Sequence, residues 1–356
     1  MRLMRHMPTD TARNNIMFDF LKNKGTFRIC YLGGSITEGA GASDKSRKWA
    51  TQITAYLNSL ELGNTVFEEI NAGIGGTDSA YGMMRLERDV ISTSPDAVFI
   101  DFSLNDMALS DDFSVRMYEG IIRKLMTLPK TPYVICVGVV PNRECEFKTE
   151  LHKKIAAHYG LQYIDVKAAI NEAYGMAEPG VNLKRDALFR PDNTHPVEAG
   201  YDFYTEVIKN ALTDNSFNKP CGAPMCADYE KRSGVFVNAR NLERSGEWTE
   251  YGEGDWNEKN LGKKGSGMET REPGAALSVA FEGNAVMLCY RLDREGGKMR
   301  ITLDGVSEVH DCRYETDNQP VTNFAKFSLC EGKHLLCAEA LEGHVKIDFV
   351  AFPKKD

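Results

Sequence analysis

Residues 27–35 read FRICYLGGS and hold the pattern that decides the fold. The first six residues are an apolar run of strand length, and two glycines and a serine follow directly. Gly33 and Gly34 allow a sharp turn that presents Ser35 at the start of a helix. In an open parallel sheet, ligands bind beyond the carboxyl ends of the strands. Ser35 therefore stands where a functional side chain is expected. A serine at this place also serves as a helix N-cap, with Glu38 completing a capping box.

The alternation of strand and helix patterns continues to residue 213. Helix-length segments, with apolar residues three and four positions apart, separate further apolar runs of strand length. Such alternation predicts an α/β domain with a parallel sheet, helices on both faces and right-handed connections. The last helix is expected over residues 196–212, because proline suits a first helical turn. The expected strands are residues 27–32, 66–70, 97–102, 133–140 and 162–165.

The pattern changes after residue 213. Residues 214–233 contain two prolines, glycine and asparagine, which is typical of a linker. Residues 234–356 show short strands at regular spacing, which predicts an all-β sandwich of the jelly-roll type. A chain of 356 residues is long for one core, so we predict an α/β domain over residues 1–213 and a β domain over residues 234–356. The pairs expected to form turns in the β domain are Glu282-Gly283, Asp304-Gly305, Glu331-Gly332 and Glu342-Gly343.

Composition and charge exclude some classes of binding partner. The net charge is −8 and no basic run stands out, which argues against binding nucleic acid or an anionic membrane surface. Nine scattered cysteines, an odd number, indicate reduced thiols. No apolar signal segment is visible in residues 1–10, so a cytoplasmic location is expected. Cys221 and Cys226 flank a loop without a second ligand pair nearby, and we expect no metal and no cofactor. Whether the chain forms a homo-oligomer stays open.

Two further strands end in residues suited to stabilising an anion. The segment NAGIGGTDS at residues 71–79 follows the second strand, and its glycines let backbone N–H groups approach a ligand closely. A plain strand-to-helix turn is the alternative interpretation. The segment SLND at residues 103–106 follows the third strand. The side chain of Asn105 donates hydrogen bonds without a change of charge, although it also suits a turn, and Asp106 is expected to anchor the loop.

An acid–base pair completes the set. In DNTHP, at residues 192–196, Asp192 and His195 lie three positions apart just before a helix. His195 would take the proton from Ser35, and Asp192 would hold the ring tautomer and stabilise the imidazolium. A lone histidine before proline is more often a solvated turn residue. With a serine and an amide at neighbouring strand ends, however, the set favours acyl transfer through a serine. His152 and His158 are expected at the surface.

The four segments, in this order, resemble the SGNH hydrolase superfamily, also called GDSL esterases. The resemblance covers roughly residues 27–212 and implies a flavodoxin-like, three-layer α/β/α domain and metal-free ester hydrolysis. It places an oxyanion hole at Ser35, Gly76 and Asn105. The last block of the family is D-x-x-H, which matches Asp192 and His195. Some members use a Ser–His dyad with a backbone carbonyl, so the role of Asp192 stays open.

The substrate is suggested by the first block and by the second domain. The GGSIT form of the first block resembles that of bacterial carbohydrate esterases, and the β domain resembles their carbohydrate-binding modules. Residues 247–256, EWTEYGEGDW, gather aromatic side chains that stack on sugar rings, or that belong to the sandwich core. We expect a serine esterase that removes acetyl groups from manno- or xylo-oligosaccharides. A lipid or thioester acylhydrolase and a non-catalytic sugar-binding protein are the alternatives. The candidate sugar-binding residues are Trp248, Tyr251 and Trp256.

Overall fold

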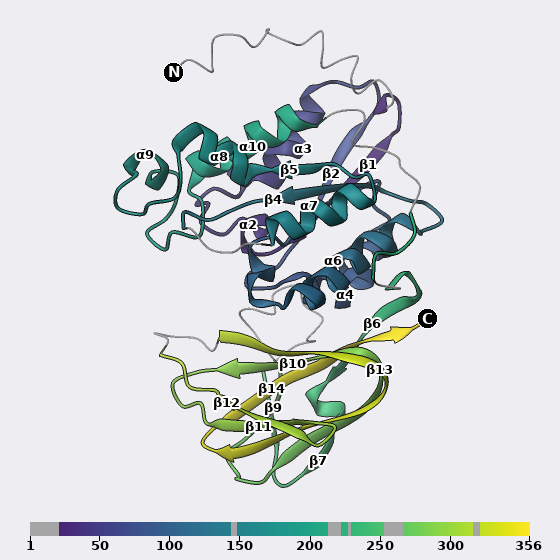
Figure 1. Cartoon of the computed structure of the whole chain (residues 1–356), viewed down its shortest axis with the longest axis vertical. Helices are drawn as coiled ribbons and strands as arrows, with labels where there is room; N and C mark the ends of the chain where they lie inside the picture. Colours follow the sequence, from purple (N-terminus) through teal and green to yellow (C-terminus); the bar gives the residue numbers. More distant parts are fainter. Residues whose placement is uncertain (1–20, 144–147, 213–221, 227–228, 253–265, 316–320) are drawn as a thin grey trace. The chain divides into compact units, whose positions relative to one another are not determined.

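The computed structural model describes residues 21–143, 148–212, 222–226, 229–252, 266–315 and 321–356. The chain divides into two compact units, residues 1–230 and 231–356 (Figure 1). The first strand of the second unit, β6 (Arg232–Asn238), begins inside the segment expected to be a linker. Within the described ranges, no helix is long and apolar enough to cross a membrane.

The first unit is built on a five-stranded parallel sheet with the order β2-β1-β3-β4-β5. The sequence prediction of an α/β unit is therefore confirmed. Strand β1 lies between β2 and β3 and pairs with both, so that Gly33 lies opposite Gly73 on one side and Asp101 on the other. The carboxyl ends of three strands, each followed by a candidate site segment, consequently meet at one edge. The strands are β1 (Thr26–Gly33), β2 (Val66–Gly73), β3 (Ala97–Asp101), β4 (Tyr133–Gly138) and β5 (Tyr163–Asp165).

Helices cover both faces of this sheet (Figure 1). Helices α3, α8 and α10 pack on one face around an apolar core that contains Trp49, Ile170 and Tyr204. Helix α6 packs against α4 and α7 on the other face. The helices are α2 (Ser35–Glu38), α3 (Trp49–Ser59), α4 (Ser79–Met84), α5 (Leu86–Asp89), α6 (Asp111–Met126), α7 (Thr149–His158), α8 (Val166–Tyr174), α9 (Leu183–Asp186) and α10 (Glu198–Ala211).

Local chemistry sets two of the helix boundaries. The side chain of Ser110 accepts a hydrogen bond from the N–H of Phe113 and caps α6, which has acidic residues in its first turn and basic residues in its last turn. Helix α10 begins at Glu198, two residues later than predicted. Pro196 instead forms an isolated β-bridge with Phe189, which keeps the chain extended up to the helix.

A buried arginine fixes the edge of the sheet where the site segments meet. Arg85 is fully buried, and its guanidinium donates to the carbonyl oxygens of Gly33 at 3.1 Å and Ala72 at 2.7 Å. Asp89 balances the charge at 3.1 Å. The carbonyl of Gly33 also accepts from the N–H of Ile74 at 3.0 Å, so Arg85 adds a second hydrogen bond there and joins the ends of β1 and β2.

The second unit is all β, as predicted, and its strands pair antiparallel around one apolar core that includes Met268, Leu288 and Ile347. Its central strand order is β12-β11-β13-β10-β14-β9-β8, with β6 beside β14 and β7 beside β10. The remaining strands are β7 (Glu243–Ser245), β8 (Thr249–Tyr251), β9 (Gly267–Thr270), β10 (Ala276–Leu292), β11 (Lys298–Leu303), β12 (Val306–Asp311), β13 (Val321–Glu342) and β14 (Val345–Lys355).

Two of the predicted turns are wrong. Glu282-Gly283 and Glu331-Gly332 lie inside the long strands β10 and β13, where Gly283 and Gly332 face each other across the ladder. The register shifts between Gly283 and Ala285, so the glycines mark a β-bulge. A Cβ at Gly283 would lie 2.7 Å from the carbonyl oxygen of Pro353, so a side chain has no room there.

Candidate active site

Ser35, His195 and Asp192 form one hydrogen-bonded row. Ser35 is the first residue of α2, directly after β1, and its Oγ lies 2.9 Å from Nε2 of His195. Nδ1 of His195 lies 2.9 Å from Oδ2 of Asp192. A carboxylate only accepts hydrogen bonds, so the ring proton sits on Nδ1 and leaves Nε2 free to accept the serine proton. The side chain of Ser35 caps no helix, because the N-cap residue of α2 is Gly34.

The loop that carries the base is fixed by short backbone bonds. Asp192 Oδ1 accepts from the N–H groups of Thr194 at 2.8 Å and His195 at 2.9 Å. Asn193 adopts a left-handed conformation with φ of 51°, which asparagine tolerates better than most residues. Its carbonyl oxygen accepts from the N–H of Asn142 at 2.9 Å. Asn142 is fully buried beyond the end of β4, a strand-end position that the sequence analysis did not single out.

The carboxylate of Asp192 is held in its charged form. Partial burial raises its pKa, but the hydrogen bonds from the ring and backbone of His195 and from the backbone of Thr194 outweigh burial and lower the pKa to about 2. Asp192 is therefore ionised throughout the neutral range. It is able to orient the ring of His195 and to stabilise a positive charge that develops on it.

Three residues that line one cavity offer hydrogen-bond donors: Ser35, Gly76 and Asn105. As the first residue of α2, Ser35 has an N–H without a partner inside the helix. Gly76 has a φ of 73°, and no atom lies within 4 Å of the position that a Cβ would occupy. Asn105 packs against Gly34 so closely that a Cβ there would lie 2.2 Å from its Oδ1. Ser35, Gly76 and Asn105 line the same cavity, and their role as donors to a developing oxyanion stays a prediction.

A cavity of about 490 Å³ opens beside this set, a volume within the range of small-ligand sites. Polar side chains of Glu38, Arg143 and Thr194 line it together with apolar Leu104 and Met107. No local sequence pattern marks Met107, Arg143 or Thr194 as wall residues, because their place in the wall depends on how distant loops meet. The residues around the cavity are Ser35, Glu38, Ala40, Gly75, Gly76, Leu104, Asn105, Met107, Arg143, Thr194 and His195.

Asp106 lies next to Asn105 and anchors it from below. It is fully buried and accepts hydrogen bonds from the backbone and hydroxyl of Ser79, each at 2.7 Å, and from Ser114 Oγ at 3.0 Å. Nε2 of His152 lies 3.0 Å from the same carboxylate, and the ring stacks on Tyr118. The prediction of a surface position for His152 is therefore wrong: an amphipathic helix turns this residue inward because a buried carboxylate receives it.

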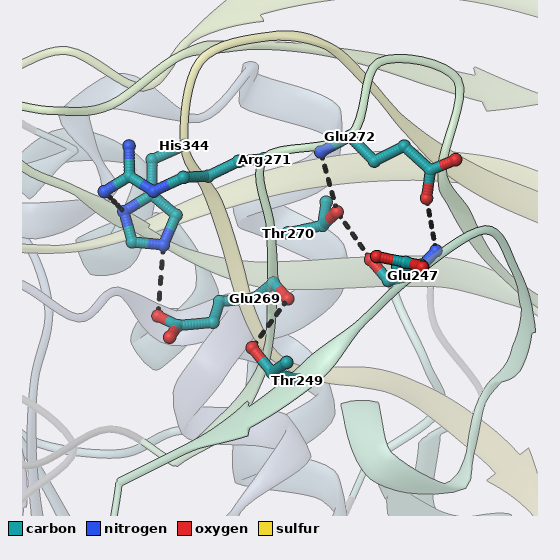
Figure 2. Close-up of a pocket in the computed structure, with 7 residues that line it drawn as sticks. All are labelled: Glu247, Thr249, Glu269, Thr270, Arg271, Glu272 and His344. Carbon is teal, nitrogen blue, oxygen red and sulfur yellow. Dashed lines mark hydrogen bonds and ion pairs between the residues drawn. The ribbon is translucent and has the colours of Figure 1, made fainter.

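The second unit has a cavity of its own, of about 340 Å³ (Figure 2). Glu247 and Thr249 of the aromatic segment line it, together with residues at and just after the end of β9 and with His344, which directly precedes β14. The hydroxyls of Thr249 and Thr270 face the backbone carbonyls of Glu269 and Glu247 respectively. Neither is paired with His344, so the cavity holds no nucleophile–base pair of the kind found at Ser35.

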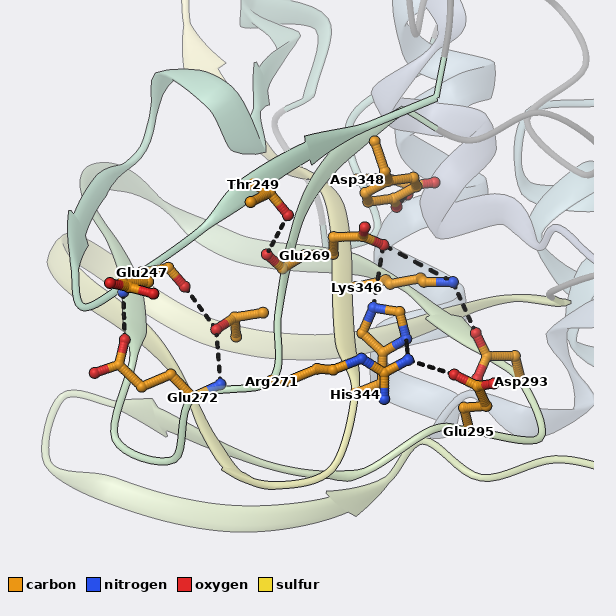
Figure 3. Close-up of polar contacts among 12 residues, drawn as sticks. Glu247, Thr249, Glu269, Arg271, Glu272, Asp293, Glu295, His344, Lys346 and Asp348 are labelled. Atoms are coloured by element: carbon orange, nitrogen blue, oxygen red, sulfur yellow. Dashed lines mark hydrogen bonds and ion pairs between the residues drawn. The ribbon is translucent and has the colours of Figure 1, made fainter.

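Charged side chains around this cavity satisfy one another (Figure 3). Burial and the nearby positive charges of Lys346 and Arg271 lower the pKa of His344. The neutral ring accepts from Arg271 at 3.2 Å and donates to Glu269 at 3.1 Å. Lys346 also pairs with Asp293 at 3.0 Å. The network fastens β9 and β14 to the β10–β11 loop.

Two of the three candidate sugar-binding residues, Trp248 and Tyr251, lie in the described part of the second unit. Trp248 is half-buried against the core of the second unit, and its Nε1 donates to the carbonyl of Ser245 at 3.2 Å. Tyr251 donates its hydroxyl proton to the buried Asp348. Trp256 lies outside the described residues. A sugar-binding role for this segment stays a prediction.

No group of three metal-ligating side chains occurs in the described part of the chain. Cys221 lies outside that part. Cys226 contacts Glu119, with Sγ 3.0 Å from Oε2.

The sequence of the first unit matches known proteins. Residues 31–203 match the GDSL-like Lipase/Acylhydrolase family. The uncharacterized lipoprotein YqeF of Bacillus subtilis (strain 168) is 28% identical over 103 residues, 29% of this chain. The match spans 42% of that protein, less than half of its length.

Solved structures resemble the whole chain. The structure of a two-domain esterase active on acetylated mannans has a TM-score of 0.77 and 21% identity, covering 98% of this chain and 96% of that one. The structure of a two-domain esterase active on acetylated mannans, co-crystallized with mannopentaose, has a TM-score of 0.75 and 22% identity. The match covers 97% of this chain and 95% of that one. At such identity the likeness shows the fold. The family match and the four segments within it show that the α/β unit of this chain belongs to the GDSL-like lipase/acylhydrolase family.

Proposed function

We propose that the chain is a serine esterase that removes O-acetyl groups from mannose- or xylose-based oligosaccharides. The observation that carries the proposal is the row Ser35–His195–Asp192, with Oγ to Nε2 and Nδ1 to Oδ2 distances of 2.9 Å, beside a cavity. Ser35 attacks the ester carbonyl as His195 takes its proton. Gly76, Asn105 and the N–H of Ser35 stabilise the oxyanion, and His195 returns the proton to the departing sugar hydroxyl. In the second half of the reaction, His195 takes a proton from water, which attacks the acetyl group on Ser35. Acetate is released, and the proton returns to Ser35.

The lining of the cavity supports a small acyl group on a polar alcohol. Glu38, Asn105, Arg143 and Thr194 offer hydrogen-bonding groups, as a sugar requires. A lipase gains about 0.8 kcal/mol for each CH₂ group that its apolar pocket buries, roughly fourfold in kcat/KM. Leu104, Met107 and Ala40 supply the apolar part of this lining, and a series of esters with longer acyl chains measures how much of that gain they provide. The similarity of both units to an esterase active on acetylated mannans is a second ground for the proposed substrate.

The test is acetate release from acetylated manno-, xylo- and chito-oligosaccharides, alongside p-nitrophenyl esters from acetate to octanoate. We expect release from the manno- or xylo-oligomers and a fall in kcat/KM as the acyl chain lengthens. A rise with chain length would instead favour the lipid or thioester acylhydrolase. No hydrolysis of any ester, together with oligosaccharide binding, would favour the non-catalytic sugar-binding protein.

Asn105→Ala should lower kcat about 10²–10³-fold with little change in KM, because an oxyanion donor acts mainly in the transition state. Steady-state kinetics on p-nitrophenyl acetate measure both constants. Asp106 is left in place, so the loop keeps its anchor. A rise in KM at constant kcat would make Asn105 a substrate-binding residue.

Asp192→Asn should lower kcat by up to about 10⁴-fold, the loss that follows when a triad acid is neutralised. Since the pKa of Asp192 is about 2, the wild-type carboxylate is charged at every pH of the assay. The anion stabilises the positive charge that develops on the ring of His195 in the transition state. Steady-state kinetics on p-nitrophenyl acetate measure the loss, and an unchanged rate would mean that the enzyme works as a Ser–His dyad.

A further inference from the structure

Glu38 is the last residue of α2, and its side chain leaves the helix to reach the second site segment. The sequence suggested a capping box with Ser35, but Oε2 of Glu38 instead accepts a hydrogen bond from the N–H of Gly75 at 2.9 Å. Gly75 directly precedes the oxyanion donor Gly76. The carboxylate lies on the wall of the cavity together with Ser35 and both glycines.

The contacts around Glu38 join two elements that must keep register for catalysis. The carbonyl of Thr37 accepts from Nδ2 of Asn71 at 2.9 Å, and Oδ1 of Asn71 accepts from the N–H of Gly73 at 2.9 Å. A Cβ on Gly73 would lie 2.3 Å from the backbone nitrogen of Glu38. The nucleophile helix and the strand β2 end are thus tied by backbone packing as far as Gly73. Beyond that point, the bond from Gly75 to Glu38 continues the tie.

The open packing around Gly76 is the reason that a tie to its neighbour matters. Its φ of 73° lies in a region open to glycine, and no atom lies within 4 Å of its Cβ position. At Gly75, a Cβ would lie 2.9 Å from Oε2 of Glu38 and 3.5 Å from Cβ of Ser35. The carboxylate of Glu38 therefore lies close to Gly75, on the side of the Gly75–Gly76 turn that faces Ser35.

We propose that Glu38 is a positioning residue, whose carboxylate holds the Gly75–Gly76 turn so that the N–H of Gly76 points at the oxyanion. The proposal rests on the esterase function proposed above. Catalysis depends on donors that are already oriented when charge develops, and a misplacement of about 1 Å can cost about 10²-fold in rate.

The charge of Glu38 sharpens the test. A carboxylate forms a stronger bond to a backbone N–H than a neutral acceptor does, which favours glutamate for positioning. The same negative charge, close to a developing oxyanion, opposes the transition state. Glutamine keeps an acceptor oxygen at the same reach and removes the charge. The geometry and the charge therefore act in opposite directions on kcat, and the two variants separate them.

The experiment compares Glu38→Ala and Glu38→Gln with wild type on p-nitrophenyl acetate, a substrate without sugar hydroxyls. Glu38→Ala should lower kcat roughly 10- to 100-fold at nearly constant KM. Glu38→Gln should restore kcat to the wild-type value or above it. Glu150→Ala, which removes an exposed carboxylate of α7, is the matched control and should match wild type.

Amide hydrogen exchange at Gly75 reads the bond itself and needs no substrate. Exchange should be faster in Glu38→Ala than in wild type and slow again in Glu38→Gln. Equal kcat in all variants, or a change only in KM for acetylated oligosaccharides, would overturn the positioning role. So would a lower melting temperature with unchanged kcat. A wild-type protein that hydrolyses no ester would refute the proposed function instead, and the exchange data would still decide whether Glu38 holds the turn.

Discussion

Ser35→Ala should lower kcat for p-nitrophenyl acetate on the order of 10⁶-fold, the loss found when the nucleophile of a serine hydrolase is removed. The substitution removes only the attacking oxygen. The backbone of α2 keeps its hydrogen bonds, and the N-cap residue Gly34 is unchanged. The melting temperature should therefore equal that of wild type.

The residual rate of this variant is informative too. Gly76 and Asn105 still surround the carbonyl, so hydrolysis above the rate in water should persist, as it does when an oxyanion hole survives. Ser43, an exposed serine that bonds to Glu198, provides a control: Ser43→Ala should keep full activity. Turnover in Ser35→Ala comparable to wild type would remove Ser35 from the mechanism.

His195→Ala should be nearly as damaging as Ser35→Ala, because an unassisted hydroxyl is a poor nucleophile near neutral pH. The ring contacts both Ser35 and Asp192 at 2.9 Å, so its removal breaks the row at its centre. Groups that act as a unit are not additive. The double variant Ser35→Ala/His195→Ala should thus be no slower than either single variant.

Steady-state kinetics of the three variants check this expectation. Independent, multiplying losses in the double variant would mean that the two residues do not work as one unit. Mild loss in His195→Ala, with full loss in Ser35→Ala, would point to another base. His158→Ala is a suitable control. His158 is the last residue of α7, and its ring contacts the carbonyl of Ala223 and not Ser35.

The sequence predicted the α/β unit and the site at its strand ends for a local reason. Each segment combines a hydrophobic run with glycine or a polar residue directly after it, and parallel strands bring these ends to one edge. The order β2-β1-β3 sets Gly33 beside Gly73 and Asp101. Ser35 and Asn105 thereby become neighbours although 70 positions separate them in the chain.

The errors arise where long-range partners decide the outcome. A Glu-Gly pair forms a turn at Glu342-Gly343, where Gly343 has a φ of 67°, but lies inside a strand at Glu282-Gly283. Only the pairing of Gly283 with Gly332 separates the two cases. His152 is buried because Asp106, 46 positions away, receives its ring. Glu38 bonds to Gly75, 37 positions away, which no local pattern foretells.

Labelling with a fluorophosphonate, which reacts with activated serines, tests the central claim most directly. Intact-mass analysis followed by peptide mapping should show one adduct for each chain, at Ser35, formed in wild type and absent from Ser35→Ala and His195→Ala. The same reagent should react faster with wild type than with Asp192→Asn, because the carboxylate orients the base. An adduct at any other serine, or labelling of Ser35 that persists in His195→Ala at the wild-type rate, would contradict the account.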